Sequence, residues 1–271
     1  MLRPNCLKDG KYLVVTLSYD DGTKHDKRLV EIMNRYGVRG TFHLNSSRVA
    51  SGAPDHVGAD EIPEVYKGHE VSVHTVTHPH PSWISPEAML VEMFEDRKAL
   101  EKACGYPVRG MSYPFGDFND KVIEQAKACG IVYSRTTRTR QDFQLPEDFL
   151  RWDATCHHRN NLMENTEKFL SFKDERCKRP RLFYVWGHSY EFNDQNNWDL
   201  IEGFCENVGN KPYVWYATNI EIYDYEQARQ RLQFSADSSM VYNPSAISVW
   251  VEDNGTPVEV KPGELYREQG K

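Results

Sequence analysis

K-Y-L-V-V-T-L-S-Y-D-D-G, residues 11–22, is an apolar and β-branched run that stops at two aspartates and a glycine. Such a run is typical of a strand that is buried on both faces, as the strands of parallel sheets are. Aspartate and glycine are residues that turns favour. The pattern therefore predicts a buried strand over residues 11–19, with Asp20 and Asp21 at its carboxyl end.

Outward from this strand, apolar strands alternate with helical segments at least seven times. A helix is expected over 24–36, with Leu29, Ile32 and Met33 on one face and Gly37 at its end. The other expected strands lie at 38–44, 70–73, 108–113, 131–134, 149–154, 181–186 and 213–215. The alternation favours an α/β fold, a distorted (β/α) barrel of about seven strands.

The pattern changes after residue 234, where short strands surround turn residues. Asn254-Gly255 is a strong signal for a hairpin turn. The sequence therefore predicts two parts, a barrel over residues 1–234 and a small C-terminal antiparallel β appendage over residues 235–271.

The chain has 271 residues, 39% of them hydrophobic, and its 33 basic and 40 acidic residues give a net charge of −7. A mildly acidic chain has no electrostatic reason to bind nucleic acid or anionic membranes. No segment approaches the ~20 apolar residues of a membrane span, and the first apolar run is too short for a signal peptide. These features predict a cytoplasmic protein and leave its oligomeric state open.

The six cysteines include no pair at C-x-x-C spacing, which fits a reduced compartment. Cys156 precedes His157 and His158, so it could ligate a metal or act as a nucleophile. A buried thiol is the favoured interpretation.

Polar residues follow several of the expected strands. Asp20 and Asp21 follow the first, His74 follows the strand at 70–73, and His188 follows the strand at 181–186. In a (β/α) barrel the carboxyl ends of all strands open on one face, where active sites lie. We therefore expect these side chains to converge.

The run H-T-V-T-H places His74 and His78 four residues apart. On a helical turn such side chains lie about 5–6 Å apart, which suits a shared metal. Alone, this spacing is a weak signal, and Asp20-Asp21-Gly22 alone could be a plain turn. Together, two imidazoles and a carboxylate form a usual catalytic zinc site, and cobalt, nickel or manganese also fits.

These motifs resemble those of the NodB-homology polysaccharide deacetylases, the fourth carbohydrate esterase family. The family motif T-F-D-D-G corresponds to residues 18–22, Ser-Tyr-Asp-Asp-Gly, and H-[ST]-x-x-H corresponds to residues 74–78. The resemblance covers roughly residues 10–225. It implies one divalent metal ion held by Asp21, His74 and His78, with Asp20 as general base and His188 as general acid.

Two further family motifs match less closely. The R-x-P-Y motif is represented by Arg109 and, after extra residues, by Pro114-Phe115. The resemblance implies that Arg109 orients the base and that the Phe115 N–H binds the oxyanion. Trp152-Asp153 is a reversed candidate for the fourth motif, which supplies an Asp and a Trp, and it could equally be an ordinary strand end.

Other residues are candidates for substrate contact. His43 follows the strand at 38–44, while Tyr113, Trp186 and Tyr190 could stack on a sugar ring. The alternative for each is packing or a solvated loop.

Three functions fit these residues. The first is metal-dependent hydrolysis of acetyl groups from N-acetylated or O-acetylated sugars or short oligosaccharides. The second keeps the metal and acts on cyclic amides, because fold alone does not fix the substrate. The third is a catalytically dead carbohydrate-binding scaffold.

Overall fold

The computed structural model describes residues 1–269 and is built around one sheet with strands in the order β7-β6-β5-β4-β3-β2-β9-β8, and with β10 also paired to β2. All of these pairs are parallel. The strands are β2 (Leu13–Asp20), β3 (Gly40–Leu44), β4 (Glu70–Val73), β5 (Gly110–Ser112), β6 (Tyr133–Thr139), β7 (Trp152–Ala154), β8 (Cys156–His157), β9 (Arg181–His188) and β10 (Val214–Tyr216).

The two end strands of this order, β7 and β8, are halves of one segment, residues 152–157. β7 pairs with β6 and β8 pairs with β9, and between them the Thr155 N–H donates to the Tyr184 carbonyl at 2.8 Å. The sheet therefore returns on itself, and the expected distorted barrel of about seven strands is confirmed. The distortion lies where β4 and β5 share only the pair Val73–Met111, and where the register shifts between β6 and β7.

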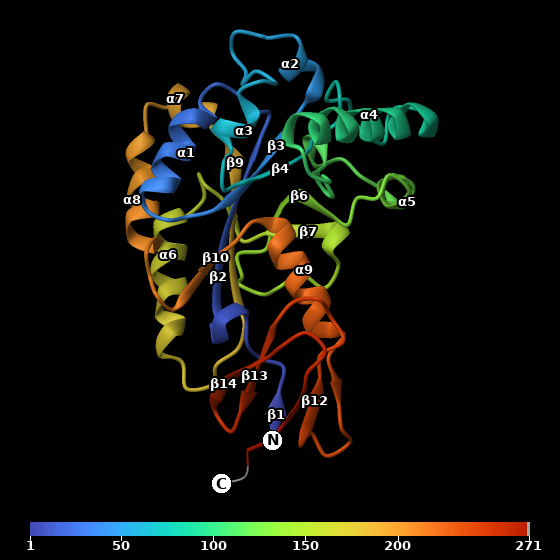
Figure 1. Cartoon of the computed structure of the whole chain (residues 1–271). Coiled ribbons are helices and arrows are strands. Elements are labelled where there is room, and N and C mark those ends of the chain that lie inside the picture. The colour runs from blue at the N-terminus through green and yellow to red at the C-terminus, as the bar shows by residue number, and fades with distance from the viewer. Residues whose placement is uncertain (270–271) are drawn as a thin grey trace.

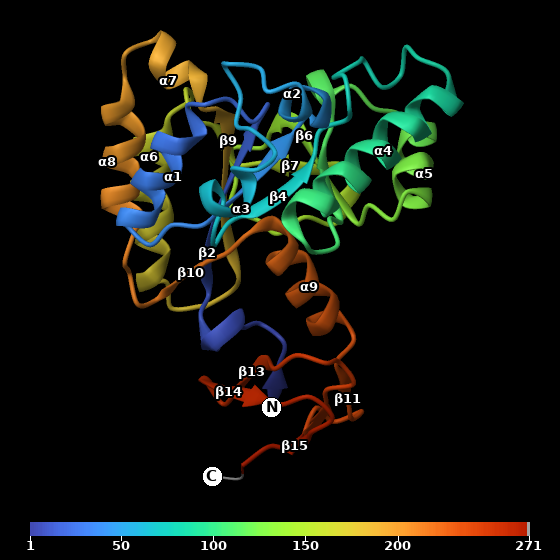
Figure 2. The same cartoon turned by 45° about the horizontal axis from the view of Figure 1, so that its top comes forward.

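Helices cover the outside of the barrel. In Figures 1 and 2, α1, α6 and α8 lie on one side, and α4 and α5 lie on the other. Within residues 1–269, no helix has both the length and the apolar character needed to cross a membrane. The helices are α1 (Asp26–Arg35), α2 (Ser46–Ala50), α3 (Ile62–Val65), α4 (Pro86–Cys104), α5 (Asp120–Ala128), α6 (Leu162–Ser171), α7 (Tyr190–Asp194), α8 (Trp198–Val208) and α9 (Asn219–Gln230), with 3-10 turns η1 (Lys8–Gly10), η2 (Pro114–Gly116), η3 (Phe149–Arg151) and η4 (Phe172–Asp174).

Local signals explain where these helices begin and end. The Ser85 hydroxyl accepts a hydrogen bond from the Ala88 N–H at the start of α4, Pro86 occupies its first position, and Gly105 ends it in the left-handed conformation. In α1, Leu29, Ile32 and Met33 are buried as predicted.

The alternation of side chains along β2 separates the core from the site. Leu13, Val15, Leu17 and Tyr19 belong to the large apolar cluster that includes the residues of α1 and α8. Successive side chains of a strand point to opposite faces, so Thr16, Ser18 and Asp20 face the barrel interior. The interior is polar there: the Thr16 hydroxyl donates to Asn219 Oδ1 at 2.9 Å, and Ser18 Oγ lies 2.8 Å from His43 Nε2. Asp20 ends this polar column at the open face of the barrel.

Two small antiparallel sheets lie at the opposite end of the barrel, below α9 in Figure 2. Their strands are ordered β1-β13-β14 and β11-β12-β15. The expected Asn254-Gly255 turn joins β13 to β14. These strands are β1 (Leu2–Arg3), β11 (Gln233–Phe234), β12 (Met240–Tyr242), β13 (Val249–Asp253), β14 (Thr256–Val260) and β15 (Leu265–Arg267).

The appendage is not purely C-terminal. β1 pairs with β13, so the first residues of the chain, which the sequence analysis assigned to the barrel, join the antiparallel strands. The division at residue 234 stays a prediction.

Candidate functional site

A cleft of about 420 Å³ opens at the carboxyl ends of the barrel strands. All of the predicted site residues except Arg109 and His43 line it. The lining residues are Asp20, Asp21, Arg48, His74, His78, Tyr113, Phe115, Thr137, Trp186, His188 and Tyr190.

Asp21, His74 and His78 meet at one point of this cleft. One ligand atom from each residue lies within 4.8 Å of the other two. Asp21 Oδ1 is 3.9 Å from His74 Nε2 and 3.8 Å from His78 Nε2, too far for hydrogen bonds. These atoms are the donor types of a zinc site, and their separations leave room for a cation among them.

The backbone that carries this set is unusual. Asp21, Thr75, His78 and Phe115 have φ of +77°, +67°, +62° and +59°, the left-handed region that side chains other than glycine rarely adopt. Such backbone strain clusters at functional sites. His74 and His78 lie after β4 in a loop, so the helical turn considered from their spacing is wrong. The turn at Thr75 and His78 brings the two rings to 4.7 Å between centroids.

The environment of His74 fixes which nitrogen faces the cleft. His74 Nδ1 lies 2.9 Å from the Ser112 carbonyl and 2.7 Å from the Ser112 hydroxyl, so Nδ1 carries the proton and Nε2 presents a lone pair. Burial lowers the pKa of His74, and burial followed by the neighbouring His74 lowers the pKa of His78. Both imidazoles are therefore neutral, the form that binds a metal.

Asp20 lies beside this set and is held by two different residues. The Arg135 guanidinium donates to Asp20 Oδ2, and the Ser112 hydroxyl lies 3.1 Å from Asp20 Oδ1. Burial alone favours the neutral acid, but Arg135 outweighs it and, with nearby histidines, lowers the pKa of Asp20 well below its usual range. Asp20 is thus an ionised carboxylate in a buried position.

Arg135 is a candidate functional residue that the sequence analysis missed, as it missed Arg48 and Thr137, which line the cleft. Arg135 is fully buried in β6, its Nε is 3.2 Å from Ser18 Oγ, and its guanidinium stacks 4.3 Å from the centre of the Trp186 ring. Counting back from Pro114 with the R-x-P-Y spacing, the arginine position of that motif is Ser112. In this chain the cation beside Asp20 is Arg135 of β6, and β5 contributes the Ser112 hydroxyl at the motif's arginine position. The sequence signal for Arg135 was an arginine within a strand pattern, Y-S-R-T-T-R-T, because a charged residue in a buried strand needs a partner of opposite charge.

The prediction that Arg109 orients the general base is wrong, because Arg109 lies away from Asp20. Arg109 precedes β5, at the end of the strand opposite the cleft, and forms a two-bond ion pair with Asp224 of α9, with N···O distances of 2.6 and 3.1 Å. A side chain there does not reach Asp20.

His188 faces Asp21 across the cleft, with His188 Nε2 4.0 Å from Asp21 Oδ2. Its other nitrogen, Nδ1, is 3.5 Å from Glu191 Oε2, which also lies 3.2 Å from His157 Nε2 and 3.1 Å from His158 Nε2. Burial opposes the charged imidazolium, but the contact with Glu191 and the carboxylates of the cleft together raise the pKa of His188. Glu191 therefore favours the protonated form of His188, and it also accepts a hydrogen bond of 3.2 Å from the His188 backbone N–H.

The four candidate substrate contacts have different surroundings. His43 is fully buried below Asp20 beside Ser18, so it does not reach the cleft. Tyr113 lines the cleft, but its hydroxyl donates to the Leu150 carbonyl at 2.9 Å. Trp186 and Tyr190 line the cleft on either side of His188.

Two other motifs from the sequence lie apart from the cleft. Trp152 is buried in the barrel core, and Asp153 accepts hydrogen bonds from Thr136 and Arg138. Cys156 is a buried thiol, as favoured, and burial raises its pKa to about 12, which makes it a poor nucleophile.

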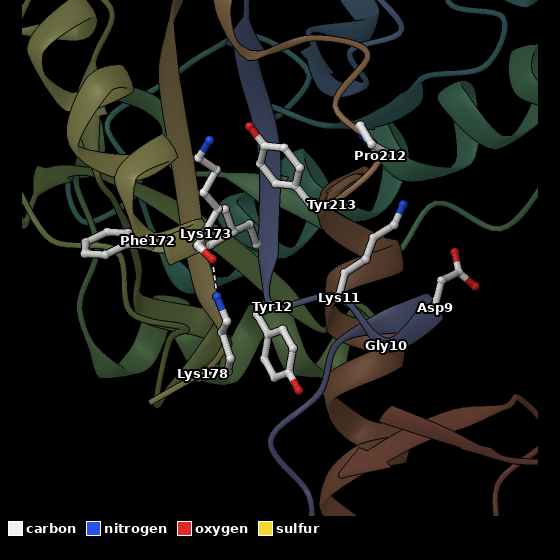
Figure 3. Close-up of a pocket in the computed structure, with 10 residues that line it drawn as sticks. Asp9, Gly10, Lys11, Tyr12, Phe172, Lys173, Lys178, Pro212 and Tyr213 are labelled. Carbon is white, nitrogen blue, oxygen red and sulfur yellow. Dashed lines mark hydrogen bonds between the residues drawn. The ribbon is translucent and has the colours of Figure 1, made fainter. Parts of the chain in front are cut away.

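A second cavity, of about 370 Å³, lies near the other end of β2 (Figure 3). It presents Lys11, Lys173 and Lys178 among aromatic side chains. Lys178 donates to the Lys173 carbonyl, drawn as a dashed line in Figure 3, and Lys11 donates to the Val214 carbonyl at 3.1 Å. Two of its three lysines are thus bound to backbone, and the cavity has no acid–base arrangement like that of the cleft.

Comparisons with known proteins agree with this geometry. A family model described as Polysaccharide deacetylase matches residues 8–134, which include Asp20, Asp21, His74, His78 and Phe115 and stop just before Arg135. Chitin deacetylase 1 of Cryptococcus neoformans is 28% identical over 117 residues, covering 43% of this chain and 24% of that protein. A chitooligosaccharide deacetylase of Bradyrhizobium is 26% identical over 135 residues, covering 49% of this chain and 59% of that protein. The match thus spans about a quarter to three fifths of these relatives.

Solved structures share the fold over most of the chain. A candidate polysaccharide deacetylase from Mycobacterium smegmatis has a TM-score of 0.62 at 16% identity, covering 85% of this chain and 96% of that one. A CE4 family pseudoenzyme from Bacillus anthracis has a TM-score of 0.51 at 18% identity, covering 78% of this chain and 65% of that one. The family model thus matches the segment that carries most of the cleft, and the solved structures share the fold over most of the chain, so residues 8–134 are similar to the polysaccharide deacetylases.

Proposed function

We propose that this protein is a divalent-metal-dependent deacetylase that hydrolyses acetyl groups of N-acetylated or O-acetylated sugars. The observation that carries the proposal is the convergence of Asp21, His74 and His78 within 4.8 Å, directly beside the ionised Asp20. The named activities of the chitin and chitooligosaccharide deacetylases support the substrate class.

Asp21 and the Nε2 atoms of His74 and His78 would hold the ion, and two neutral imidazoles with one carboxylate suit zinc. The ion would supply an acidified water and a Lewis acid for the acetyl carbonyl. The Ser112 carbonyl accepts the Nδ1 proton of His74 and so fixes its tautomer. Nε2 of His74 therefore already presents a lone pair to the metal position.

Asp20 acts as the general base. Its carboxylate, kept ionised by Arg135, accepts the proton of the attacking water. The Ser112 hydroxyl holds the second carboxylate oxygen and thereby fixes the plane of the group.

His188 and Phe115 complete the reaction. His188 donates its Nε2 proton to the leaving nitrogen or oxygen, while Glu191 supports the imidazolium through Nδ1. The Phe115 N–H donates to the acetyl oxygen as negative charge develops there. The left-handed backbone of Phe115 sets the direction of that N–H.

The test combines metal analysis with acetate release from N-acetylglucosamine oligomers and acetylated xylan. We expect wild type to release acetate only when loaded with metal. Asp20→Asn should keep the metal and lose about 10²–10⁴-fold in rate, the usual contribution of a general base. His74→Ala should lose the metal as well as the activity.

Two other outcomes would replace the proposal. Bound metal with no acetate release, but with hydrolysis of cyclic imides, would assign a cyclic amide hydrolase. Sugar binding with no metal uptake under any condition would assign a binding scaffold, a role that fits a fold shared with a pseudoenzyme.

A further inference from the structure

A row of aromatic rings leads from the cleft to the surface. The His78 ring lies edge-on to the Phe115 ring, with centroids 4.5 Å apart. Phe115 stacks on His80 at 3.8 Å with 13° between the ring planes, and His80 stacks on Trp83 at 4.0 Å with 16°. Trp83 is thus three ring contacts from a candidate metal ligand, in the loop 79–84 that follows the His74–His78 motif.

Both large apolar members of this row face solvent. Trp83 is 76% exposed and Phe115 is 56% exposed. A single exposed apolar residue is ordinary. Here two of them, joined by His80, form a continuous surface that begins at the cleft.

The loop that carries Trp83 is fastened independently of the Trp83 ring. The Ser82 N–H donates to Asp117 Oδ2 at 2.8 Å, and the Ser82 hydroxyl donates to Asp117 Oδ1 at 2.7 Å. The Trp83 backbone N–H donates to the His80 carbonyl at 3.1 Å. A tryptophan needed only to fasten the loop would be buried, whereas this ring is held in one place with most of its area free. Such an anchor loses little entropy when a ligand covers it.

We propose that Trp83, backed by His80 and Phe115, is a subsite for a second sugar ring of the substrate, so that the enzyme acts on an oligosaccharide. This rests on the proposed deacetylase function. The apolar face of a pyranose ring can cover an aromatic ring, and aromatic surfaces dominate the energetics of binding sites.

The first arm of the test measures kcat/KM on N-acetylglucosamine oligomers of one to four units. We expect the ratio of tetramer to monomer kcat/KM to fall about tenfold in Trp83→Ala, equivalent to one stacking contact, and to recover in Trp83→Phe. Phe94→Ala is the matched control, because Phe94 is a similarly exposed aromatic side chain on α4. An unchanged ratio in Trp83→Ala would overturn the subsite.

The second arm needs no catalysis. The tetramer is titrated into metal-free wild type and Trp83→Ala while tryptophan emission and binding heat are recorded. We expect the wild type to bind about tenfold more tightly and to show a blue shift that the variant lacks. Equal affinities would overturn the subsite. Trp83-dependent binding without acetate release would keep the subsite and reject the deacetylase. Equal sugar affinity together with a Trp83-dependent change in self-association would assign this surface to protein contact and overturn the proposal.

Discussion

Two clusters of histidines and a carboxylate lie side by side at the open face of the barrel, and they differ in spacing. In the first, Asp21 Oδ1 is 3.8–3.9 Å from the nearest nitrogens of His74 and His78. In the second, Glu191 Oε2 is 3.1 and 3.2 Å from nitrogens of His158 and His157. The same residue types therefore form two different kinds of site.

The spacing decides what each cluster can do. Atoms 3.8–3.9 Å apart share no proton, so these three atoms can all turn to a cation, and the only hydrogen bond that Asp21 Oδ1 accepts within the described residues is a long one of 3.4 Å from Arg48 Nη1. The second cluster is a network of charge-assisted hydrogen bonds, to which Arg159 adds a contact of 3.0 Å. The hydrogen bonds from its histidines overcome burial and lower the pKa of Glu191. One nitrogen each of His157 and His188 and one oxygen of Glu191 also lie within 4.8 Å of one another, so residue type and proximity admit a metal at both clusters, and only the close contacts of Glu191 distinguish the second.

The largest expected effect tests this difference directly. We expect His78→Ala to weaken Zn²⁺ binding by at least about a hundredfold, because it removes a ligand, whereas His157→Ala should retain affinity within a few-fold. Equilibrium dialysis with elemental analysis measures both variants. If His157→Ala loses Zn²⁺ affinity and His78→Ala retains it, the metal site is the second cluster and not the first.

Much of the first cluster could be predicted from sequence because its parts are local. Strand β2 ends at Asp20 as a run of buried residues that stops at a turn, and His74 and His78 lie in one short motif. The barrel then brings strand ends together. The loop conformation of the two histidines could not be predicted, since spacing of four residues also fits a helix.

The residues that hold Asp20 in place could not be predicted in the same way. Arg135 contacts Asp20 across 115 positions of the chain, and strand periodicity does not say which side chain crosses a barrel interior. Arg109 was chosen because it precedes the Pro114-Phe115 motif, but it lies at the wrong end of β5. The pairing of Leu2 and Arg3 with β13 likewise joins the two ends of the chain, which no local pattern reports.

The next largest effect compares two arginines. We expect Arg135→Met to lower kcat about 10²–10³-fold with metal retained, because the pKa of Asp20 rises when its buried partner is removed. Arg109→Met, which breaks a part-exposed ion pair, should stay within about threefold. Deacetylation kinetics and metal content are measured together.

Loss of the buried pair could also unfold the protein. Arg135→Lys, which keeps the charge, and a thermal melt of each variant separate the two effects. A folded Arg135→Met variant with wild-type kcat would show that Asp20 needs no cation.

A smaller effect is expected from the second cluster. Glu191→Gln should lower kcat about 10-fold, because His188 loses the carboxylate that favours its protonated form, while metal affinity changes little. The control is Glu202→Gln, which removes a surface partner of Arg35 on α8. A hundredfold loss of metal in Glu191→Gln would instead make the second cluster part of the metal site.

The smallest effect concerns buried carboxyls that have no cation beside them. Asp26 is fully buried and receives hydrogen bonds from the hydroxyls of Ser189 and Tyr66, at 2.5 and 2.7 Å. Burial raises its pKa to about 7, in contrast to Asp20, whose neighbour Arg135 keeps it ionised. The comparison shows that depth alone does not decide the charge of a carboxyl in this protein.

A raised pKa in the folded state means that folding is favoured while Asp26 is protonated. Its contribution is complete below about pH 4, the ordinary pKa of an aspartic acid, and is lost as pH rises through about 7. Asp26→Asn keeps the neutral form and its hydroxyl partners, so it should reduce the loss of unfolding free energy between pH 5 and pH 8 by roughly 1–3 kcal/mol. Urea unfolding at both pH values measures this, with the exposed Asp60→Asn as control. An Asp26→Asn variant that loses as much stability as wild type over this range would mean that Asp26 is ionised in the folded protein.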